Sequence, residues 1–316
     1  MVVGWFHFLY RSRVAEPQGE IYYLKPAEKK VTVIEELSIT PKWLAVLYIY
    51  AHPTAHLKEG EYFFPKGATL AAIFHQITTG SGLYYRAFTI VPGWTFAEVR
   101  ANLNQNPMLH HLTRNWSDAM IMQQLGSPIS QAEGLFFPET YRYTRGVTDL
   151  VILKQAYALM QFQLNQAWQM RAANLPYQNP YEALITASLI EREGYLDKER
   201  PEISGVIINR LNKHMRLQID ASVIYGLGSA YTGTLHKADL TDPSVYNTYL
   251  HSGLPPTPIA MPGMPSILAA LHPEMSNNYY YVAKGDGSHV FSETLEQQEA
   301  AIKTYEHHVP SSNKSK

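Results

Sequence analysis

The chain contains 316 residues, of which 46% are hydrophobic and 17% are charged. This length is typical of about two domains, and the composition argues against extensive disorder. The 26 Lys and Arg residues nearly balance the 27 Asp and Glu residues, so the chain lacks the basic excess that is typical of nucleic-acid-binding proteins. Because it has no cysteine, thiol nucleophiles, cysteine-based zinc sites and disulfides are excluded.

The first ten residues are apolar, and Arg11 and Arg13 follow them. They are too few for a membrane-spanning helix, which needs about 20 residues. On its own, this segment is compatible with a short buried strand or with the remainder of a membrane anchor, and the strand is the favoured interpretation. At the other end, the polar residues 309–316 are predicted to be disordered.

Residues 19–92 are predicted to mix strands and helices. Short strand-like runs occur at 19–24 and 31–39, and residues 41–50 have a helical pattern that begins at a proline. The pattern further along predicts a strand, a helix and a strand at 61–64, 69–78 and 84–91. These three elements form a small strand–helix–strand unit over about residues 58–91.

Residues 93–308 are predicted to form the larger domain. Thr95 and Glu98 have the spacing of a capping box, which marks the start of a helix. Three longer helices and a hairpin are predicted at 148–171, 181–194, 203–214 and 279–292. The first of these helices carries an apolar stripe that ends at Met170, and a loop rich in proline follows Leu250.

Glu191 is the candidate catalytic carboxylate. It lies four residues after Ala187, so it shares the apolar stripe of its helix. A carboxylate buried on such a stripe tends to keep its proton near neutral pH, which is what a general acid for a glycosidic oxygen requires. The alternative is a structural ion pair with Arg192, Arg210 or Arg216, and the pattern alone favours this alternative.

Other chemistries have weaker support. The chain contains neither G-x-S-x-G nor H-E-x-x-H, which disfavours a serine hydrolase and a zinc hydrolase. Glu193 lies about 200° around the helix from Glu191, so we do not expect the two to form a glycosidase pair facing one substrate. Polar side chains that suit sugar hydroxyl and acetamido groups are concentrated downstream, at Asn209, Arg210, Gln218, Asp220, Tyr225, Asn247 and Tyr249.

Five stretches of the larger region carry a specific resemblance to a known family. They are EGLFFPETYRY (133–143), ASLIEREG (187–194), VIINRLNKHMRLQIDASVIYGLG (206–228), YNTYLHSGLPPTPIAMPG (246–263) and YYYVAKGDGSHVFSETLEQ (279–297). In this order they resemble the MltG (YceG-like) family of endolytic murein transglycosylases. The resemblance implies an α+β fold, in which a LysM-like strand–helix–strand subdomain, matched by residues 60–80, precedes a mixed α/β catalytic domain. The sequence departs from the family at Pro92-Gly93, where the family usually has Glu-Gly.

The same resemblance implies a function, and it assigns Glu191 as the helix-borne catalytic glutamate. The bond cleaved would join N-acetylmuramic acid to N-acetylglucosamine within nascent peptidoglycan strands, leaving 1,6-anhydro-muramyl ends and terminating strand elongation. Peptidoglycan synthases are implied as partners, with one N-terminal anchor in the inner membrane and a periplasmic catalytic domain. Residues 1–18 then become the remainder of that anchor and its juxtamembrane segment. No cofactor or metal ion is needed.

Our hypothesis for the mechanism is that Glu191 protonates the bridging oxygen and then, as a base, takes the proton of the muramyl C6 hydroxyl. The candidates for substrate binding are Asn209, Gln218, Asp220, Tyr225, Asn247, Tyr249 and His289. Two alternatives stay open. One is a non-catalytic module that binds peptidoglycan or acts as a scaffold, and the other is an ordinary muramidase in which Asp220 faces Glu191 as the second carboxylate.

Overall fold

The computed structural model describes residues 18–37, 42–51, 56–194 and 196–305. The expectations for the apolar start of the chain and for its polar tail lie outside these residues. Within the described ranges, no helix combines the length and the apolar character that crossing a membrane requires. Helices alternate there with three two-stranded sheets, which confirms the α+β fold class.

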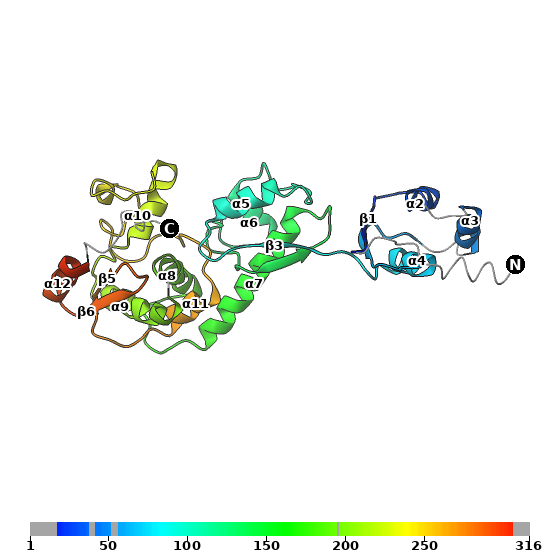
Figure 1. The fold of residues 1–316 in the computed structure, drawn as a ribbon. Helices are drawn as coiled ribbons and strands as arrows, with labels where there is room; N and C mark the ends of the chain where they lie inside the picture. The colour runs from blue at the N-terminus through cyan, green and yellow to red at the C-terminus, as the bar shows by residue number, and fades with distance from the viewer. Residues whose placement is uncertain (1–17, 38–41, 52–55, 195, 306–316) are drawn as a thin grey trace. The chain divides into compact units, whose positions relative to one another are not determined.

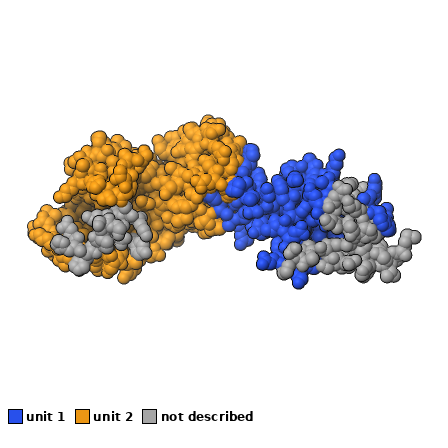
Figure 2. Space-filling model, turned by 45° about the horizontal axis from the view of Figure 1, so that its top comes forward, with its two compact units in different colours: residues 1–88, 107–110, 142–148 blue, residues 89–106, 111–141, 149–316 orange. Residues whose placement is uncertain are grey.

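The chain divides into two compact units (Figure 2). Unit 1 is built from residues 1–88, 107–110 and 142–148, and unit 2 is built from residues 89–106, 111–141 and 149–316. The expected boundary was residue 92. Unit 1 thus includes two later segments that the sequence pattern placed in the catalytic domain. A single boundary position cannot describe a unit to which the chain comes back after leaving it.

The core of unit 1 lies under a two-stranded sheet. Strand β1 (Glu20–Leu24) pairs antiparallel with β2 (Gly60–Phe64), with Tyr22 opposite Tyr62. Alternate residues of both strands point inward, and Leu24 and Phe64 are almost fully buried. Helix α4 (Leu70–Thr79), capped by the Thr69 side chain, packs its apolar face onto this core.

The expected strand at 31–39 is wrong. The described residues of this segment form helix α2 (Lys30–Glu36), and helix α3 (Lys42–Ala51) follows. A run of four consecutive β-branched residues at 31–34 suggested a strand. Val33 instead packs into the core of unit 1 from a helical backbone, so packing overrides local propensity here.

The predicted strand–helix–strand unit has its three elements but not a sheet of its own. Its first strand, β2, pairs with β1, while its last strand, β3 (Arg86–Thr89), pairs with β4 (Thr140–Tyr143). An isolated bridge between Tyr62 and Leu83 links the two ends of the unit. Strand pairing between segments so far apart in the chain leaves no local trace in the sequence.

Unit 1 also contains a buried carboxylate. The side chain of Glu61 is 2% exposed and lies 2.7 Å from Arg86 Nε and 3.3 Å from Arg145 Nη1. The hydrogen bond from Arg86 keeps the pKa of Glu61 below its usual value, despite burial. Arg145 also stacks over the ring of Tyr23, 4.2 Å from the ring centre.

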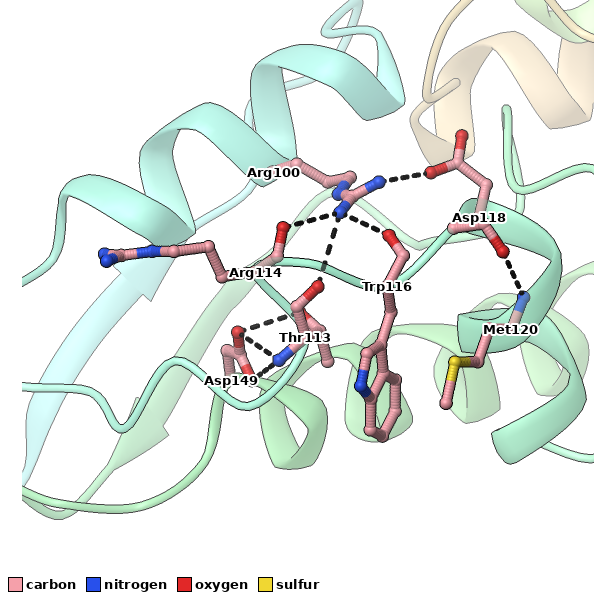
Figure 3. Close-up of polar contacts among 8 residues, drawn as sticks. Arg100, Thr113, Arg114, Trp116, Asp118, Met120 and Asp149 are labelled. Atoms are coloured by element: carbon pink, nitrogen blue, oxygen red, sulfur yellow. Dashed lines mark hydrogen bonds and ion pairs between the residues drawn. The ribbon is translucent and has the colours of Figure 1, made fainter.

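Unit 2 begins with two short helices joined by a loop that one arginine organises. Helix α5 (Phe96–Gln105) has the predicted capping box of Thr95 and Glu98. Arg100 on α5 bonds to Asp118 at 2.6 Å, at the start of helix α6 (Asp118–Gln124), and donates to three backbone carbonyls of the loop (Figure 3). The buried Asp149 fixes the other side of this loop by accepting hydrogen bonds from Thr113.

The centre of unit 2 is helix α8 (Pro180–Glu193), which starts at the Asn179 cap and is buried from Ala183 to Ile190. Helices α7 (Asp149–Gln169), α9 (Arg200–Asn212), α10 (Asp220–Leu227) and α11 (Met264–Leu271) pack around it (Figure 1). The predicted stripe of α7 is buried up to Ala167. Met170, which follows the end of the helix, is 65% exposed.

The C-terminal part of unit 2 is the predicted hairpin followed by a helix. Strand β5 (Tyr280–Ala283) pairs antiparallel with β6 (His289–Ser292), and helix α12 (Leu295–Tyr305) follows and packs on both strands. Strand β5 also contacts α9. This contact brings the hairpin to the C-terminal end of α8, because α8 and α9 pack together.

Candidate functional site

Two glutamates, Glu191 and Glu193, occupy the last turn of α8, and the helix ends directly after them at Gly194. A Cβ at Gly194 would come within 2.9 Å of the Arg200 side chain, so only glycine fits where the chain leaves α8 so close to α9. The two carboxylates contact different residues, in agreement with their separation of about 200° around the helix. Each therefore has its own environment.

Glu191 is held in a network of donors. Its Oε2 accepts the backbone N–H of Gly263 at 2.9 Å and the Ser266 hydroxyl at 2.8 Å, and it lies 3.1 Å from Arg200 Nη1. Arg200 in turn bonds to Ser266 and, at 2.9 Å, to Asp197. The Glu191 side chain is only 7% exposed. All three of these donors meet a single oxygen of the carboxylate.

This network is the ion pair that the sequence left open, but with a different partner. The three expected arginines bond to backbone carbonyls instead: Arg192 to Gly93, Arg210 to Leu217 and Tyr279, and Arg216 to Tyr249. The actual partner, Arg200, comes from the start of α9. Through Gly263 and Ser266, Glu191 also ties the end of the proline-rich loop to α8.

Glu193 lies in a different environment. The backbone N–H of Ala221, at the start of α10, and the Tyr281 hydroxyl, 3.4 Å away on β5, both donate to its carboxylate. Burial, reinforced by the nearby negative charge of Asp220, raises the pKa of Glu193 from 4.5 to about 7. The residue is still partly exposed. A carboxyl group in this state holds a proton near neutral pH and can give it to a ligand.

Comparisons with known proteins agree on the affiliation of the chain. Residues 27–304 match the YceG-like family. The chain belongs to this family. Over 279 residues it is 30% identical to a Bacillus subtilis protein named endolytic murein transglycosylase, covering 82% of this chain and 76% of that one.

Further relatives of this YceG-like chain extend the picture. A Streptococcus pneumoniae protein of the same name is 31% identical over 156 residues, which span 48% of this chain and 28% of the pneumococcal protein. Among solved structures, a yceG-like protein of Listeria monocytogenes has a TM-score of 0.59 at 23% identity, covering 90% of this chain and 99% of that one. This likeness supports the fold alone.

Two of the predicted substrate-binding residues, Asp220 and Tyr249, lie near Glu193, and Gln218 is held beside the segment that carries Tyr249. Asp220 is exposed, and its Oδ1 accepts the Tyr249 hydroxyl at 2.6 Å. Gln218 is exposed and accepts a hydrogen bond from Arg210 at 3.3 Å. We call Glu193, Gln218, Asp220, Tyr249 and Tyr281 the Glu193 cluster.

The backbone at Gln218 adds to this description of the Glu193 cluster. Its φ of 52° lies in the left-handed region, which non-glycine residues rarely adopt and which is enriched at functional sites. This conformation lets the Gln218 N–H donate to the Thr248 carbonyl at 3.1 Å. The segment that supplies Gln218 and Asp220 is therefore held directly beside the segment that supplies Tyr249.

Tyr225 belongs to another group of side chains. Its hydroxyl donates to the buried Glu133 at 3.0 Å, and its ring packs edge-on against Tyr246. Glu133 also accepts the backbone N–H of Phe96 at 2.9 Å, and burial raises its pKa to about 7. The Tyr225 hydroxyl is thus engaged in a hydrogen bond with Glu133, and only the ring of Tyr225 could contact a ligand.

The two predicted asparagines have their amides engaged by the backbone. Asn209 donates to the carbonyls of Ser276 and Asn278, both at 2.9 Å. Asn247 is 0% exposed and donates to the carbonyls of Leu240 and Asp242. In this arrangement they shape loops, and Asn247 offers no surface to a sugar.

His289, the last predicted substrate-binding residue, lies on β6, where its ring contacts Tyr281 of the Glu193 cluster. The described His, Asp and Glu side chains form no group of three that could hold a metal ion. Sequence reasoning passed over Glu193 and Tyr281, although both lie within stretches that carry the family resemblance. The available signal was Gly194, because a glutamate at the end of a helix meets residues from other segments.

Proposed function

We propose that this YceG-like protein is an endolytic murein transglycosylase in which Glu193 acts first as general acid and then as general base. The names of the Bacillus and Streptococcus relatives support the reaction class. The choice of glutamate rests on one observation: the Glu193 carboxyl, with a pKa of about 7, lies near the exposed side chain of Asp220.

The motif resemblance assigns the acid to Glu191, and the geometry favours Glu193. Glu191 faces a cation and two further donors on the same oxygen, so that oxygen is already engaged by partners within the protein. Glu193 has no arginine within ion-pair distance among the described residues. A general acid works best when its pKa lies near the operating pH.

The reaction then needs one carboxyl group. Glu193 gives its proton to the bridging oxygen while the bond from muramyl C1 to that oxygen breaks, and C1 acquires oxocarbenium character. The ionised Glu193 next takes the proton of the muramyl C6 hydroxyl, whose oxygen bonds to C1 and closes the 1,6-anhydro ring. Atoms and protons balance without water. Gln218, Asp220 and Tyr249 would hydrogen-bond the hydroxyl and acetamido groups of the sugars.

The cellular setting is part of this proposal. The enzyme would cut nascent glycan strands beside the peptidoglycan synthases and so terminate their elongation. It would be held at the cell membrane by its N-terminal residues, with unit 2 on the outer, periplasmic side. Murein strands are the substrate that the relatives' name specifies.

A hydrolytic muramidase is the second candidate. The charge of Asp220 contributes to the raised pKa of Glu193, so the two carboxyl groups are near enough to interact. In a hydrolase, Asp220 would serve as nucleophile or as base for a water molecule. Asp220 therefore pairs with Glu193, and not with Glu191 as the sequence suggested for this alternative.

The test is mass spectrometry of uncrosslinked glycan strands digested by the wild-type protein and by Glu193→Gln, Glu191→Gln and Asp220→Asn. We expect internal cuts with anhydro-muramyl ends, a loss of roughly 10²–10⁴-fold for Glu193→Gln, and the same products for Asp220→Asn. Reducing ends that vanish in Asp220→Asn would establish the hydrolase. Full activity of Glu193→Gln, together with loss of activity in a folded Glu191→Gln, would assign the general acid to Glu191. Binding of the strands without cleavage by the wild-type protein would indicate a binding module.

A further inference from the structure

The hairpin β5–β6 places a histidine behind the tyrosine that contacts Glu193. His289 on β6 is directly opposite Ala283 of β5 in the strand pairing, and Tyr281 lies on β5 two residues before Ala283. The rings of Tyr281 and His289 meet edge to face, with centroids 5.4 Å apart and an interplanar angle of 88°. His289 therefore limits where the Tyr281 ring can move.

A single carboxylate fixes the histidine itself. Glu199 lies in the 3-10 turn Asp197–Glu199, shortly after the end of α8. Its Oε2 accepts the backbone N–H of His289 at 3.1 Å and lies 2.9 Å from Nδ1 of the ring. These two contacts with one carboxylate oxygen set the orientation of the ring. Both side chains are almost buried, at 9% and 12% exposure.

Tyr281 completes the connection to Glu193. Burial raises its pKa well above the usual value, so the hydroxyl stays protonated and remains a donor. It contacts Glu193 Oε2 at 3.4 Å, a long separation that a small movement of the ring would break. The other charged groups near these two residues are Asp220 on α10, Arg210 on α9 and Arg192 on α8.

We propose that His289, locked by Glu199, is a positioning residue that holds the Tyr281 hydroxyl against the carboxyl group of Glu193. The proposal rests on the proposed catalytic role of Glu193. A hydrogen bond from Tyr281 stabilises the ionised form of Glu193, which is the form that must accept the C6 proton in the second step. The hairpin thus prepares the same carboxyl group for its role as base.

The readout is the pH dependence of kcat/KM on uncrosslinked glycan strands. Activity needs protonated Glu193, so it falls as the pH rises through the pKa of that residue. Without the Tyr281 hydroxyl, the ionised form loses a donor, the pKa rises, and this alkaline limb moves to higher pH. For a hydrogen bond of ordinary net strength, the shift is about half a pH unit.

The experiment compares wild type, Tyr281→Phe, His289→Ala and the double variant. We expect both single variants to move the limb upward, and the double variant to move it no further than Tyr281→Phe alone. Glu202→Gln is the matched control, because its carboxyl lies near Glu199 but bonds to Asn278; it leaves the limb in place. If His289→Ala does not fold, Glu199→Ala releases the ring instead, with the same expected shift.

Two results would overturn this inference. One is a limb that stays at its wild-type position in folded His289→Ala, with only the melting temperature lowered, which would make the histidine merely structural. The other is a double variant whose shift is the sum of the two single shifts, which would mean that His289 acts independently of Tyr281. Both results are distinguishable from failure of the proposed function, because in that case the Glu193→Gln variant would keep its activity.

Discussion

Glu191 and Glu193 are two residues apart on one helix, yet their carboxyl groups meet different surroundings. Glu191 meets Arg200, the Ser266 hydroxyl and a backbone N–H on a single oxygen, which is a structural anchor for an anion. Glu193 meets a tyrosine hydroxyl, a backbone N–H and a second carboxylate, and its pKa is about 7. The neighbours supplied by other segments, and not the residue type or the helix, set these two environments.

The largest expected effect is on stability at Glu191. Glu191→Ala leaves the guanidinium of Arg200, whose side chain is 11% exposed, without its buried partner. Breaking a buried ion pair from one side costs about 3–5 kcal/mol. Urea denaturation at neutral pH measures this loss. A loss below about 1 kcal/mol would show that Glu191 is no anchor, and the contrast between the two glutamates would fail.

Glu193→Gln should have the opposite effect on stability. The folded protein holds Glu193 with a pKa of about 7, above its ordinary 4.5. Between these pH values the folded state binds more protons than the unfolded state, so wild-type stability falls as the pH rises. Glutamine removes this penalty and should stabilise the protein by up to about 3 kcal/mol at pH 8, and hardly at all near pH 4. Denaturation of both proteins at the two pH values is the check, and equal stability at pH 8 would contradict a raised pKa.

Asp220→Asn sharpens the account of why Glu193 keeps its proton. The negative charge of Asp220 raises the pKa of Glu193, so its neutralisation lowers that pKa. We expect the alkaline limb of kcat/KM to move to lower pH by at most about one unit. This direction is opposite to that expected for Tyr281→Phe. A limb that does not move would mean that burial alone sets the pKa.

The smallest expected effect concerns one donor of the Glu191 network. Ser266→Ala removes a buried hydroxyl that donates to Glu191 at 2.8 Å, which should cost about 1 kcal/mol. Ser204→Ala is the matched control, because Ser204 is equally buried and its hydroxyl has no hydrogen-bond partner among the described residues. The two thermal unfolding curves should therefore differ, and identical curves would show that Ser266 adds nothing to the anchor.

The sequence predicted elements well where the pattern is local. The capping box at Thr95, the helices α7, α8 and α9, and the hairpin β5–β6 are all present. It failed where the answer depends on a distant segment. Residues 31–36 are helical and bury Val33 in the core of unit 1, and β2 and β3 lie in different sheets.

For the site, sequence reasoning placed its candidate acid in the last turn of α8, the turn that also carries Glu193, and it anticipated that the two carboxylates face different ways. It also selected Asp220 and Tyr249, which lie near Glu193, and Gln218, which bonds to Arg210. What it could not supply was the identity of each neighbour. Arg200 reaches Glu191 and Tyr281 reaches Glu193 only because α9 and the hairpin fold back onto α8.

The double arginine clamp on Glu61 limits how this protein can be recombined. Arg86 belongs to the first stretch of chain in unit 1, but Arg145 comes from a stretch that follows 49 residues of unit 2, at 89–106 and 111–141. A chimaera that exchanges residues 1–88 for those of another protein would leave Arg145 without its partner Glu61 and without its contact with the Tyr23 ring. Residues 1–88 therefore cannot be exchanged alone, and a replacement of unit 1 must also replace residues 142–148.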